Sequence, residues 1–391
     1  MGVLVPADVI SQQLSSAELV ADIKINSLDV SSDPSVALKT LASAEILAVH
    51  RNNSSVKIQN REEIQIEFPG GELDGIGVMF SGLPRPHRDQ SYKAYLNKLE
   101  GSNSKYIITG FGAGLQPLNP TRRYTRTRTD GSNGKGDGPF LYWDKRYFPI
   151  PYLISAPSFK NHPDYVTAIE ESFKTWRAYE DVLIEFLSYG CNQSTKNEND
   201  GLNTIILKTD EWPFPPKTGE EPAIAVTRNF YISGDGSSAG LILDSDILLN
   251  GINYKFTTQG ISGRHDIQNI VTHEIGHFLG FGHDIGIPAP ACENNEEKCG
   301  DQDATMYYAA EANQTKKRTL HANDIAALRA AYAGVGQKFN DGNLHCDVTS
   351  NTVGCLAVHS EKNNSGNYLA LAIYLILTLG VGRWIVTHQK T

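Results

Sequence analysis

Three histidines and one glutamate lie within eleven residues, from His273 to His283. His273 and His277 are four residues apart, so on a helix their side chains lie on the same face and can offer two nitrogens to one cation. Glu274 follows the first histidine and is placed to take a proton from water beside the cation. Gly280 lacks a Cβ, which lets the helix end in a sharp turn toward His283. No other stretch constrains the fold as tightly, because it requires a helix, a turn and a cation in one place.

Three neutral nitrogens and one open position for water are the ligands expected of a catalytic zinc ion, whereas a structural zinc has a fourth protein ligand. No cysteine lies within eight residues of the stretch to supply one. The alternative is a surface helix that carries histidines by chance. With 11 histidines in 391 residues, the whole pattern arises by chance in on the order of one chain in ten thousand. The sequence therefore predicts a zinc site made by His273, His277 and His283, with Glu274 as general base.

The spacing H-E-x-x-H-x-x-G-x-x-H is followed by Met306, in the sequence Ala-Thr-Met-Tyr-Tyr at 304–308. This combination resembles the signature of the metzincin zinc metalloproteases. The resemblance implies a catalytic domain with a twisted mixed sheet, an active-site helix, a methionine turn beneath the histidines and a C-terminal helix. It also implies a zinc-dependent endopeptidase that hydrolyses peptide bonds of extracellular proteins, with Met306 and Tyr308 supporting the metal site.

The branch of the family is less clearly indicated. Residues 320–332 are similar to the last helix of the matrixins, which favours a matrixin-like protein. The sequences at 68–72, 81–84 and 110–114 resemble an N-terminal domain of some bacterial secreted matrixin-like proteins. Tyr308 stands two residues after Met306, as in astacin-like and serralysin-like relatives, whereas matrixins usually have proline there. No cysteine precedes Cys191, so the cysteine switch that keeps animal matrixins latent is absent as such. Two alternatives stay open: a cell-surface binding protein on an inactive metzincin scaffold, and a zinc hydrolase of non-peptide amides or esters.

The sequence pattern and the resemblance together predict an α+β protein, in which a small all-β domain precedes the metzincin-like domain. In the N-terminal part Ile64, Ile66 and Phe68 alternate with polar residues, as in a half-buried strand, and glycine-containing turns follow. We expect five parts in order: a β-rich accessory domain at 1–120, a flexible linker at 121–138, the zinc protease domain at 139–336, a polar tail with a cysteine pair at 337–366, and a hydrophobic segment at 367–391.

Apolar patterning places the elements of the protease-like domain. A helix is predicted from Pro163, with apolar residues spaced by three and four, and Asp266 or Ser262 is expected to cap the active-site helix. Residues 223–227 are expected at the sheet edge, where the resemblance implies that an extended substrate adds a strand; a simple buried strand is the alternative. The other expected strands are residues 150–154, 183–186, 204–207 and 239–250.

Two further polar features are singled out near the active-site helix. Asp244 and Asp246 alternate onto one face of their strand, which makes Ca²⁺ a second candidate metal. His265 lies outside the zinc motif and is expected at the surface.

Charge and cysteine content bear on partners and compartment. A net charge of −9 with a pI near 5.7 gives no reason to expect nucleic acid, and the arginines at 122–128 are interpreted as part of a solvated linker. We expect a monomer that acts on protein or peptide substrates. The spacing of the cysteines predicts local disulfides Cys292–Cys299 and Cys346–Cys355, which implies an oxidising compartment. Cys191 is expected to remain an unpaired buried thiol.

The end of the chain is apolar. Residues 368–382 are fifteen uncharged, mainly apolar residues, followed by Arg383 and Lys390. This segment predicts a C-terminal membrane anchor or sorting segment, with a docked helix as the alternative. The expected location is therefore extracellular or at the cell surface. No secretory signal opens the sequence, so we expect either a start further upstream or another route of export.

Overall fold

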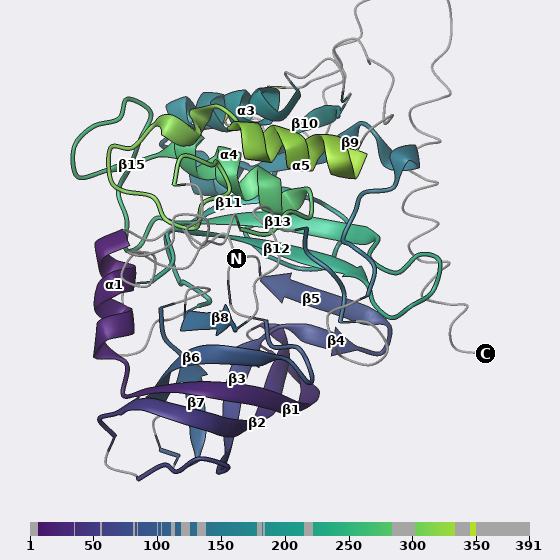
Figure 1. The fold of residues 1–391 in the computed structure, drawn as a ribbon. Helices are drawn as coiled ribbons and strands as arrows, with labels where there is room; N and C mark the ends of the chain where they lie inside the picture. Colours follow the sequence, from purple (N-terminus) through teal and green to yellow (C-terminus); the bar gives the residue numbers. More distant parts are fainter. Residues whose placement is uncertain are drawn as a thin grey trace, which may run out of the picture. The chain divides into compact units, whose positions relative to one another are not determined.

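The computed structural model describes residues 7–348, with gaps at 119–125, 131–137, 178–181, 215–221, 284–301 and 333–344 and shorter gaps of one to three residues elsewhere. Two large sheets and a layer of helices make up the described part (Figure 1). This mixed architecture, with more strand than helix, confirms the expectation of an α+β protein.

The first sheet is a small barrel formed by the N-terminal part of the chain. Its strand order is β1-β2-β3-β7-β6-β8, and β1 also pairs with β6, so that the sheet closes on itself. Apolar side chains alternate inward along these strands, and Ile23, Ile66 and Tyr106 are almost fully buried among them. The strands are β1 (Leu19–Asp33), β2 (Ala37–Asn52), β3 (Glu63–Pro69), β6 (Ser91–Lys98), β7 (Lys105–Ile108) and β8 (Leu115–Pro117).

The second sheet has the order β10-β9-β11-β13-β12-β5-β4. β9, β10, β11 and β13 are parallel, while β12 runs antiparallel to β13. The last two strands, β4 and β5, come from the N-terminal part of the chain and pair antiparallel with each other and, through β5, with β12. The bounds are β4 (Gly71–Leu73), β5 (Ile76–Phe80), β9 (Ile150–Ser155), β10 (Phe186–Asn192), β11 (Thr204–Lys208), β12 (Ala225–Ile232) and β13 (Ile242–Asn250).

Helices α3 (Pro163–Arg177) and α4 (Ile267–Phe278) pack on this sheet and against each other. Helix α5 (Ala322–Tyr332) adds buried side chains to the same core. In Figure 1 they lie together on one side of β12 and β13. Their shared core is aromatic: Trp176 and Phe278 are almost fully buried, and the Tyr332 hydroxyl donates to the backbone of the turn after α4. The smaller elements are α1 (Ala7–Ser16), α2 (Ala156–Phe159), β14 (Phe256–Thr257), β15 (His265–Asp266) and the 3₁₀ turns η2 (Lys145–Tyr147) and η5 (Lys316–Arg318).

Part of the expected linker is bound to the second sheet and its helices. Arg126 forms an isolated β-bridge with Phe281, and the Thr127 amide donates to the Gly280 carbonyl at 3.0 Å. Asp130 is buried. These contacts fasten residues 126–130 beside the turn that follows α4.

The disulfide bond differs from the expected pairing. Cys191, in β10, is bonded to Cys346, which lies 155 residues further along the chain. The expectations of a free Cys191 and of a Cys346–Cys355 bond are therefore wrong, because closeness in sequence does not decide which thiols the fold brings within bonding distance. The other expected bond, Cys292–Cys299, lies outside the described residues.

His265 is buried, contrary to expectation. It belongs to β15, is 6% exposed and has its ring centroid 5.2 Å from that of Tyr254. Burial lowers the pKa of His265 to about 4. The pairing of β14 with β15 removes this side chain from water, a long-range effect that its local sequence does not reveal.

The expected membrane anchor also needs correction. None of the described helices is long and apolar enough to cross a bilayer. Residues 368–382, on which the expectation rested, lie outside the described residues. Membrane attachment, and the cell-surface location inferred from it, therefore have no support in the structure.

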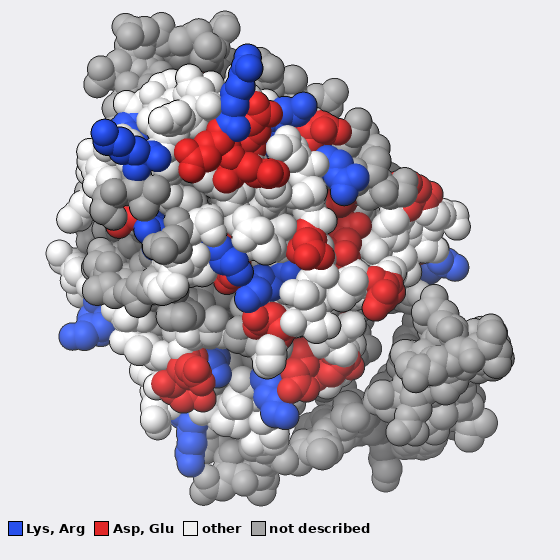
Figure 2. All heavy atoms as spheres, turned by 90° about the horizontal axis from the view of Figure 1, so that it is seen from below, with Lys and Arg blue, Asp and Glu red and all other residues white. Residues whose placement is uncertain are grey.

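The surface carries charges of both signs. On the face shown in Figure 2, Lys and Arg side chains lie interspersed with Asp and Glu among uncharged residues.

Candidate metal centre

Helix α4 is held at its beginning by Asp266. One oxygen of this carboxylate accepts the Asn269 amide at 3.0 Å, which is the N-cap hydrogen bond expected from the sequence. Arg318, from η5, donates to both carboxylate oxygens of Asp266, at 2.9 and 2.5 Å. The cap therefore fixes where the helix starts and joins it to the segment that follows the methionine turn.

The end of α4 depends on Gly280. Its φ of +85° is in the left-handed region that favours glycine, and a Cβ there would lie 2.8 Å from the Leu141 carbonyl oxygen. The Gly280 amide donates to the His277 carbonyl at 2.9 Å, which closes the turn. A residue with a side chain would have to move the backbone at Leu141 aside, so this glycine sets the path of the chain to His283.

The three predicted histidines meet in one place. Their candidate ligand nitrogens all lie within 4.8 Å of one another, and all three side chains are buried. The Nε2 atoms of His273 and His277 are 3.0 Å apart, and the ring centroid of His283 lies 5.2 and 4.9 Å from those of His273 and His277. The helix spacing and the turn together produce the arrangement that the sequence predicted.

Hydrogen bonds orient two of the imidazoles. His273 Nδ1 lies 2.5 Å from the Thr305 carbonyl oxygen, and His277 Nδ1 lies 2.7 Å from the Phe281 carbonyl oxygen. A carbonyl oxygen only accepts, so both Nδ1 atoms carry the proton. Burial lowers the pKa of both histidines well below its usual range, which keeps the rings neutral. Each Nε2 therefore presents a lone pair to the other.

Two lone pairs facing each other at this distance repel unless a cation lies between them. Zinc bound tetrahedrally at 2.0–2.1 Å separates two ligand nitrogens by about 3.3 Å, close to the 3.0 Å between these Nε2 atoms. Donation from the other ring nitrogen to a backbone carbonyl is also the usual support of a metal-binding histidine. The three side chains thus fit a zinc ion.

Glu274 lies beside the histidines and is fully buried. The Thr227 hydroxyl, on β12, donates to its Oε2 atom at 2.7 Å, while no described group hydrogen-bonds to Oε1. Burial raises the pKa of Glu274 to about 8, although the Thr227 hydrogen bond acts in the other direction. One oxygen is therefore positioned by the sheet and the other is available to a water or a substrate.

The Met306 side chain lies against α4. It is buried against Gly276, where a Cβ would collide with the methionine sulfur. The turn is held by Asp324 from α5, whose carboxylate accepts the Thr305 and Met306 amides at 2.7 and 3.0 Å. Because the Thr305 carbonyl also orients His273, α5 acts on the candidate metal site through this turn.

Tyr308 lies beside His283. Its ring centroid is 6.2 Å from that of His283, and its hydroxyl accepts from Tyr307 at 3.4 Å. Burial raises the pKa of Tyr308, so the phenol remains protonated. The side chain can donate a hydrogen bond at neutral pH, as its expected supporting role requires.

Lys317 is a buried residue that the sequence analysis did not single out. Its Nζ donates to the Tyr307 carbonyl and lies 3.4 Å from His273 Nδ1. Burial lowers the pKa of its ammonium well below the usual range. Lys317 belongs to the basic sequence Lys-Lys-Arg of η5, a pattern that is typical of an exposed segment. Only the packing of η5 on α4 buries it beside His273.

The two aspartates proposed for Ca²⁺ instead organise the loop before β11. Asp244 accepts the Gly201 amide at 2.7 Å, and Asp246 accepts the Thr204 amide at 2.8 Å. Burial raises the pKa of Asp244 to about 8. Among the described residues, the converging group of metal-ligand side chains is the histidine group, so Ca²⁺ stays a prediction.

The sequence was also compared with known proteins. It matches none of the family models and none of the curated proteins. What the chain does must therefore be argued from the geometry described above.

Proposed function

We propose that this protein is a metzincin-like zinc endopeptidase that hydrolyses peptide bonds. The observation that carries the proposal is the convergence of the His273 and His277 Nε2 lone pairs, with His283 alongside and a half-satisfied, buried Glu274 next to them. A buried carboxylate with one unbonded oxygen is costly to keep. It is explained by a catalytic role beside a metal.

The residues divide the work of hydrolysis between them. Zinc, when bound, acidifies water and polarises the scissile carbonyl. A cation bound by the histidines would favour the ionised form of Glu274 despite its burial. The Oε1 atom of the ionised carboxylate takes the proton of the attacking water and then passes it to the leaving amine nitrogen. Thr227 holds the carboxylate in place through Oε2. The Thr305 and Phe281 carbonyls keep two imidazoles in the tautomer that binds metal.

Metal analysis and a peptidase assay test this assignment. We expect about one zinc per chain in the wild type and in Glu274→Gln, because glutamine keeps the shape of a side chain that is not a ligand. His277→Ala should lose the zinc. Casein cleavage should fall about 10²-fold or more in Glu274→Gln, the usual contribution of a general base.

Glu171→Gln is the matched control, because Glu171 is an exposed glutamate on α3 that pairs with Lys174. It should retain both zinc and activity. Cleavage by Glu274→Gln at the wild-type rate would remove Glu274 from the reaction, and a protein purified without zinc would remove the metal site. A zinc-loaded chain that cleaved no peptide would instead favour the inactive binding scaffold.

A further inference from the structure

The edge of the second sheet beside Glu274 is already occupied by another part of the chain. β5 pairs antiparallel with β12 along five residues, from Phe80 opposite Arg228 to Ile76 opposite Ile232. Figure 1 shows β5 and β4 continuing the sheet beyond β12. Thr227, the next residue of β12, is the one that donates to Glu274. The pairing with β5 therefore ends at Arg228, next to the residue that holds the candidate catalytic carboxylate.

This pairing uses the backbone groups that an extended peptide needs. A peptide that binds by adding a strand hydrogen-bonds to the free edge of a sheet. β12 is the edge strand of the sheet that supports the histidines, apart from the hairpin of β4 and β5. Among the described strands, none but β13 pairs with residues 225–227. These three residues are buried, and β5 occupies the edge of β12 from Arg228 to Ile232, where an extended peptide would add its strand.

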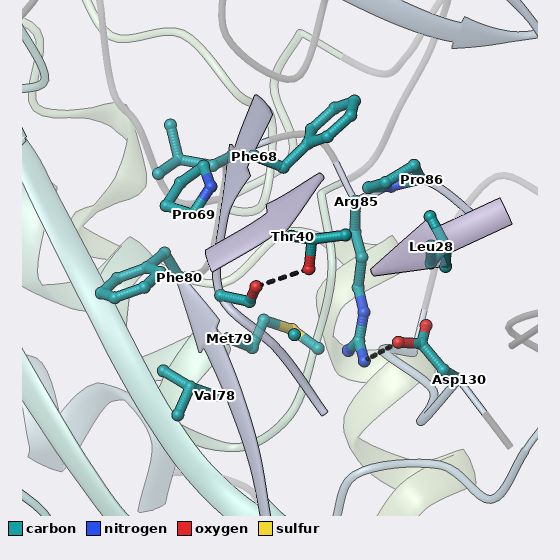
Figure 3. A pocket seen from close by; sticks show the side chains of 13 residues that line it. Leu28, Thr40, Phe68, Pro69, Val78, Met79, Phe80, Arg85, Pro86 and Asp130 are labelled. Atoms are coloured by element: carbon teal, nitrogen blue, oxygen red, sulfur yellow. Dashed lines mark hydrogen bonds and ion pairs between the residues drawn. The ribbon is translucent and has the colours of Figure 1, made fainter. Parts of the chain in front are cut away.

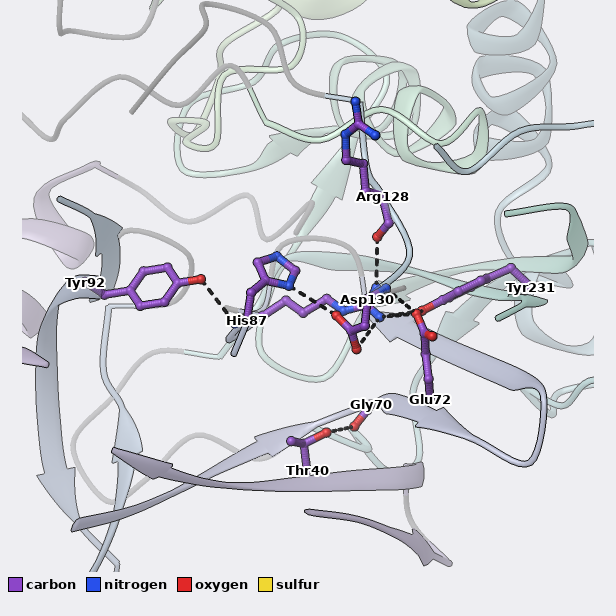
Figure 4. Close-up of polar contacts among 9 residues, drawn as sticks. Thr40, Gly70, Glu72, His87, Tyr92, Arg128, Asp130 and Tyr231 are labelled. Carbon is purple, nitrogen blue, oxygen red and sulfur yellow. Dashed lines mark hydrogen bonds and ion pairs between the residues drawn. The ribbon is translucent and has the colours of Figure 1, made fainter. Parts of the chain in front are cut away.

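A partly buried cluster of polar and charged side chains fastens the hairpin to β12, and Figure 4 labels its members Glu72, His87, Asp130 and Tyr231. Arg85 Nη2 contacts the Glu72 and Asp130 carboxylates at 2.8 and 2.9 Å and the Tyr231 hydroxyl at 2.6 Å. The Tyr231 hydroxyl donates to Glu72 at 3.0 Å, and His87 Nδ1 contacts Asp130 at 3.1 Å. These residues come from β4, from the segment after β5, from residue 130 and from β12. The cluster holds all four segments at one point.

The cluster lies next to a small pocket on the barrel side of the hairpin (Figure 3). Arg85 and Asp130 line the pocket together with Thr40 and apolar side chains of the barrel and hairpin. The Thr40 hydroxyl donates to the Gly70 carbonyl at 2.7 Å, just before β4 begins. None of the three histidines lines this pocket. The hairpin is thus anchored to the barrel on one side and to β12 on the other.

Gly77 allows the hairpin to approach this closely. A Cβ at this position would overlap the Tyr231 ring. The glycine therefore lies flat on the tyrosine, and the pairing of β5 with β12 depends on the absence of a side chain there. A larger residue at this position would act as a wedge between the two strands.

We propose that the β4–β5 hairpin is an internal inhibitor of the candidate peptidase, one that occupies the substrate edge of β12 until it is displaced. The inference rests on the proposed function, because it names the regulation of the same site. The inhibitor is a strand of this chain, and the molecule that it excludes is an extended peptide. Removal of the hairpin from β12 opens the edge without altering the histidines or Glu274.

Two variants of the full chain move the hairpin in opposite directions. Gly77→Val wedges β5 away from the Tyr231 ring, and Gly236→Val is its matched control, because a Cβ at Gly236 meets nothing within 4 Å. Ile76→Cys with Ile232→Cys locks the hairpin, since directly opposed antiparallel residues are within disulfide distance. The wild type under the same oxidising and reducing conditions controls for the native Cys191–Cys346 bond.

Two readouts separate this proposal from the proposed function. One is kcat/KM for a quenched fluorescent peptide, and the other is the Kd of a zinc-loaded chain for a labelled peptide hydroxamate, which reports access without turnover. Gly77→Val should raise both kcat/KM and affinity about tenfold or more, because a competing state is depopulated. The oxidised lock should lower both by a similar factor relative to its reduced form, and Gly236→Val should match the wild type.

The outcomes are distinct. Tighter hydroxamate binding in Gly77→Val with no peptide cleavage supports the inhibitory hairpin and contradicts the peptidase assignment. Equal cleavage and equal hydroxamate affinity in the wild type, the wedge variant and the oxidised lock overturn the inhibitory hairpin and leave the peptidase assignment standing. If Gly77→Val does not fold, the lock decides alone: equal cleavage and equal hydroxamate affinity in its oxidised and reduced forms overturn the inhibitory hairpin.

Discussion

At the scale of single residues, the described part of the chain buries several charges, and each one has an identifiable partner or task. Glu274 receives one hydrogen bond, from Thr227, and keeps its other oxygen unbonded. Asp130 is buried and pairs with the guanidinium of Arg85, whose side chain is 18% exposed. Buried charges without partners are strongly destabilising, so these positions are sensitive to substitutions that keep the shape and remove one interaction.

Thr227 is expected to act through Glu274. Thr227→Val removes the donor to Oε2 at almost constant volume, so the carboxylate loses its fixed orientation. A hydrogen bond to a charged group contributes roughly 1.5–3 kcal/mol, which corresponds to a fall in kcat/KM of about 10- to 150-fold. Zinc content should not change, and Thr227→Ser should restore most of the activity. If Thr227→Val cleaved peptide like the wild type, the hydrogen bond would have no part in catalysis.

The lowered pKa of Asp130 predicts that the folded protein loses stability in acid. Burial alone would raise its pKa, but Arg85 and His87 outweigh burial and hold the pKa at about 2, below the usual 3.8. The folded state therefore binds the proton more weakly than the unfolded state. Stability from this group is fully present above about pH 4 and is lost as the pH falls toward 2, by about 2 kcal/mol in total. Urea unfolding across this range measures it.

Asp130→Asn is the control for that measurement. The amide does not titrate, so the variant should be less stable at pH 6 and should lose less stability than the wild type between pH 4 and 2. Identical pH profiles for the two proteins would show that Asp130 is not the group responsible.

At the scale of elements, the candidate site is assembled from α4, the methionine turn and α5. Asp324 connects them: its carboxylate, on α5, accepts the two turn amides, and the turn carbonyl of Thr305 orients His273. An interaction that orients a metal ligand from behind typically changes metal affinity by about 10- to 100-fold when it is removed.

Asp324→Ala should therefore weaken zinc binding by about 10- to 100-fold, measured by competition with a chelator of known affinity. The neighbouring Asn323→Ala is the matched control, because its side chain is not part of this contact, and should bind zinc like the wild type. Unchanged zinc affinity in Asp324→Ala would mean that the turn holds its shape without α5.

At the scale of the whole molecule, long-range connections hold the second sheet together. The Cys191–Cys346 bond joins β10 to a segment 155 residues later, beyond the helices that pack on the sheet. A disulfide that closes a long loop restricts the unfolded chain, and its removal from a protein typically costs about 2–5 kcal/mol. The double variant Cys191→Ser with Cys346→Ser should lose this much in chemical unfolding. The wild type unfolded with a reductant should match it; equal stability with and without the bond would contradict the expectation.

Much of the candidate site could be predicted from the sequence, because its main residues are close neighbours in the chain. His273 and His277 are brought together by the pitch of a single helix, and Gly280 and His283 follow within one turn, so their geometry is set by neighbours in the chain. The same holds for Asp266, which was expected as a cap and is one. Lys317 and Asp324 escaped notice because each acts on the histidines from another element.

What the sequence determined by itself is therefore local: a helix with two histidines on one face, the turn that follows it, and the apolar stripes that bury α3 and α4. What only the tertiary structure decided is which distant segments meet. The pairing of β5 with β12, the burial of His265 and the Cys191–Cys346 bond all join parts of the chain that no short-range pattern relates. Such contacts form because the folded chain buries apolar surface and pairs every strand edge it can, and both conditions are met only by the molecule as a whole.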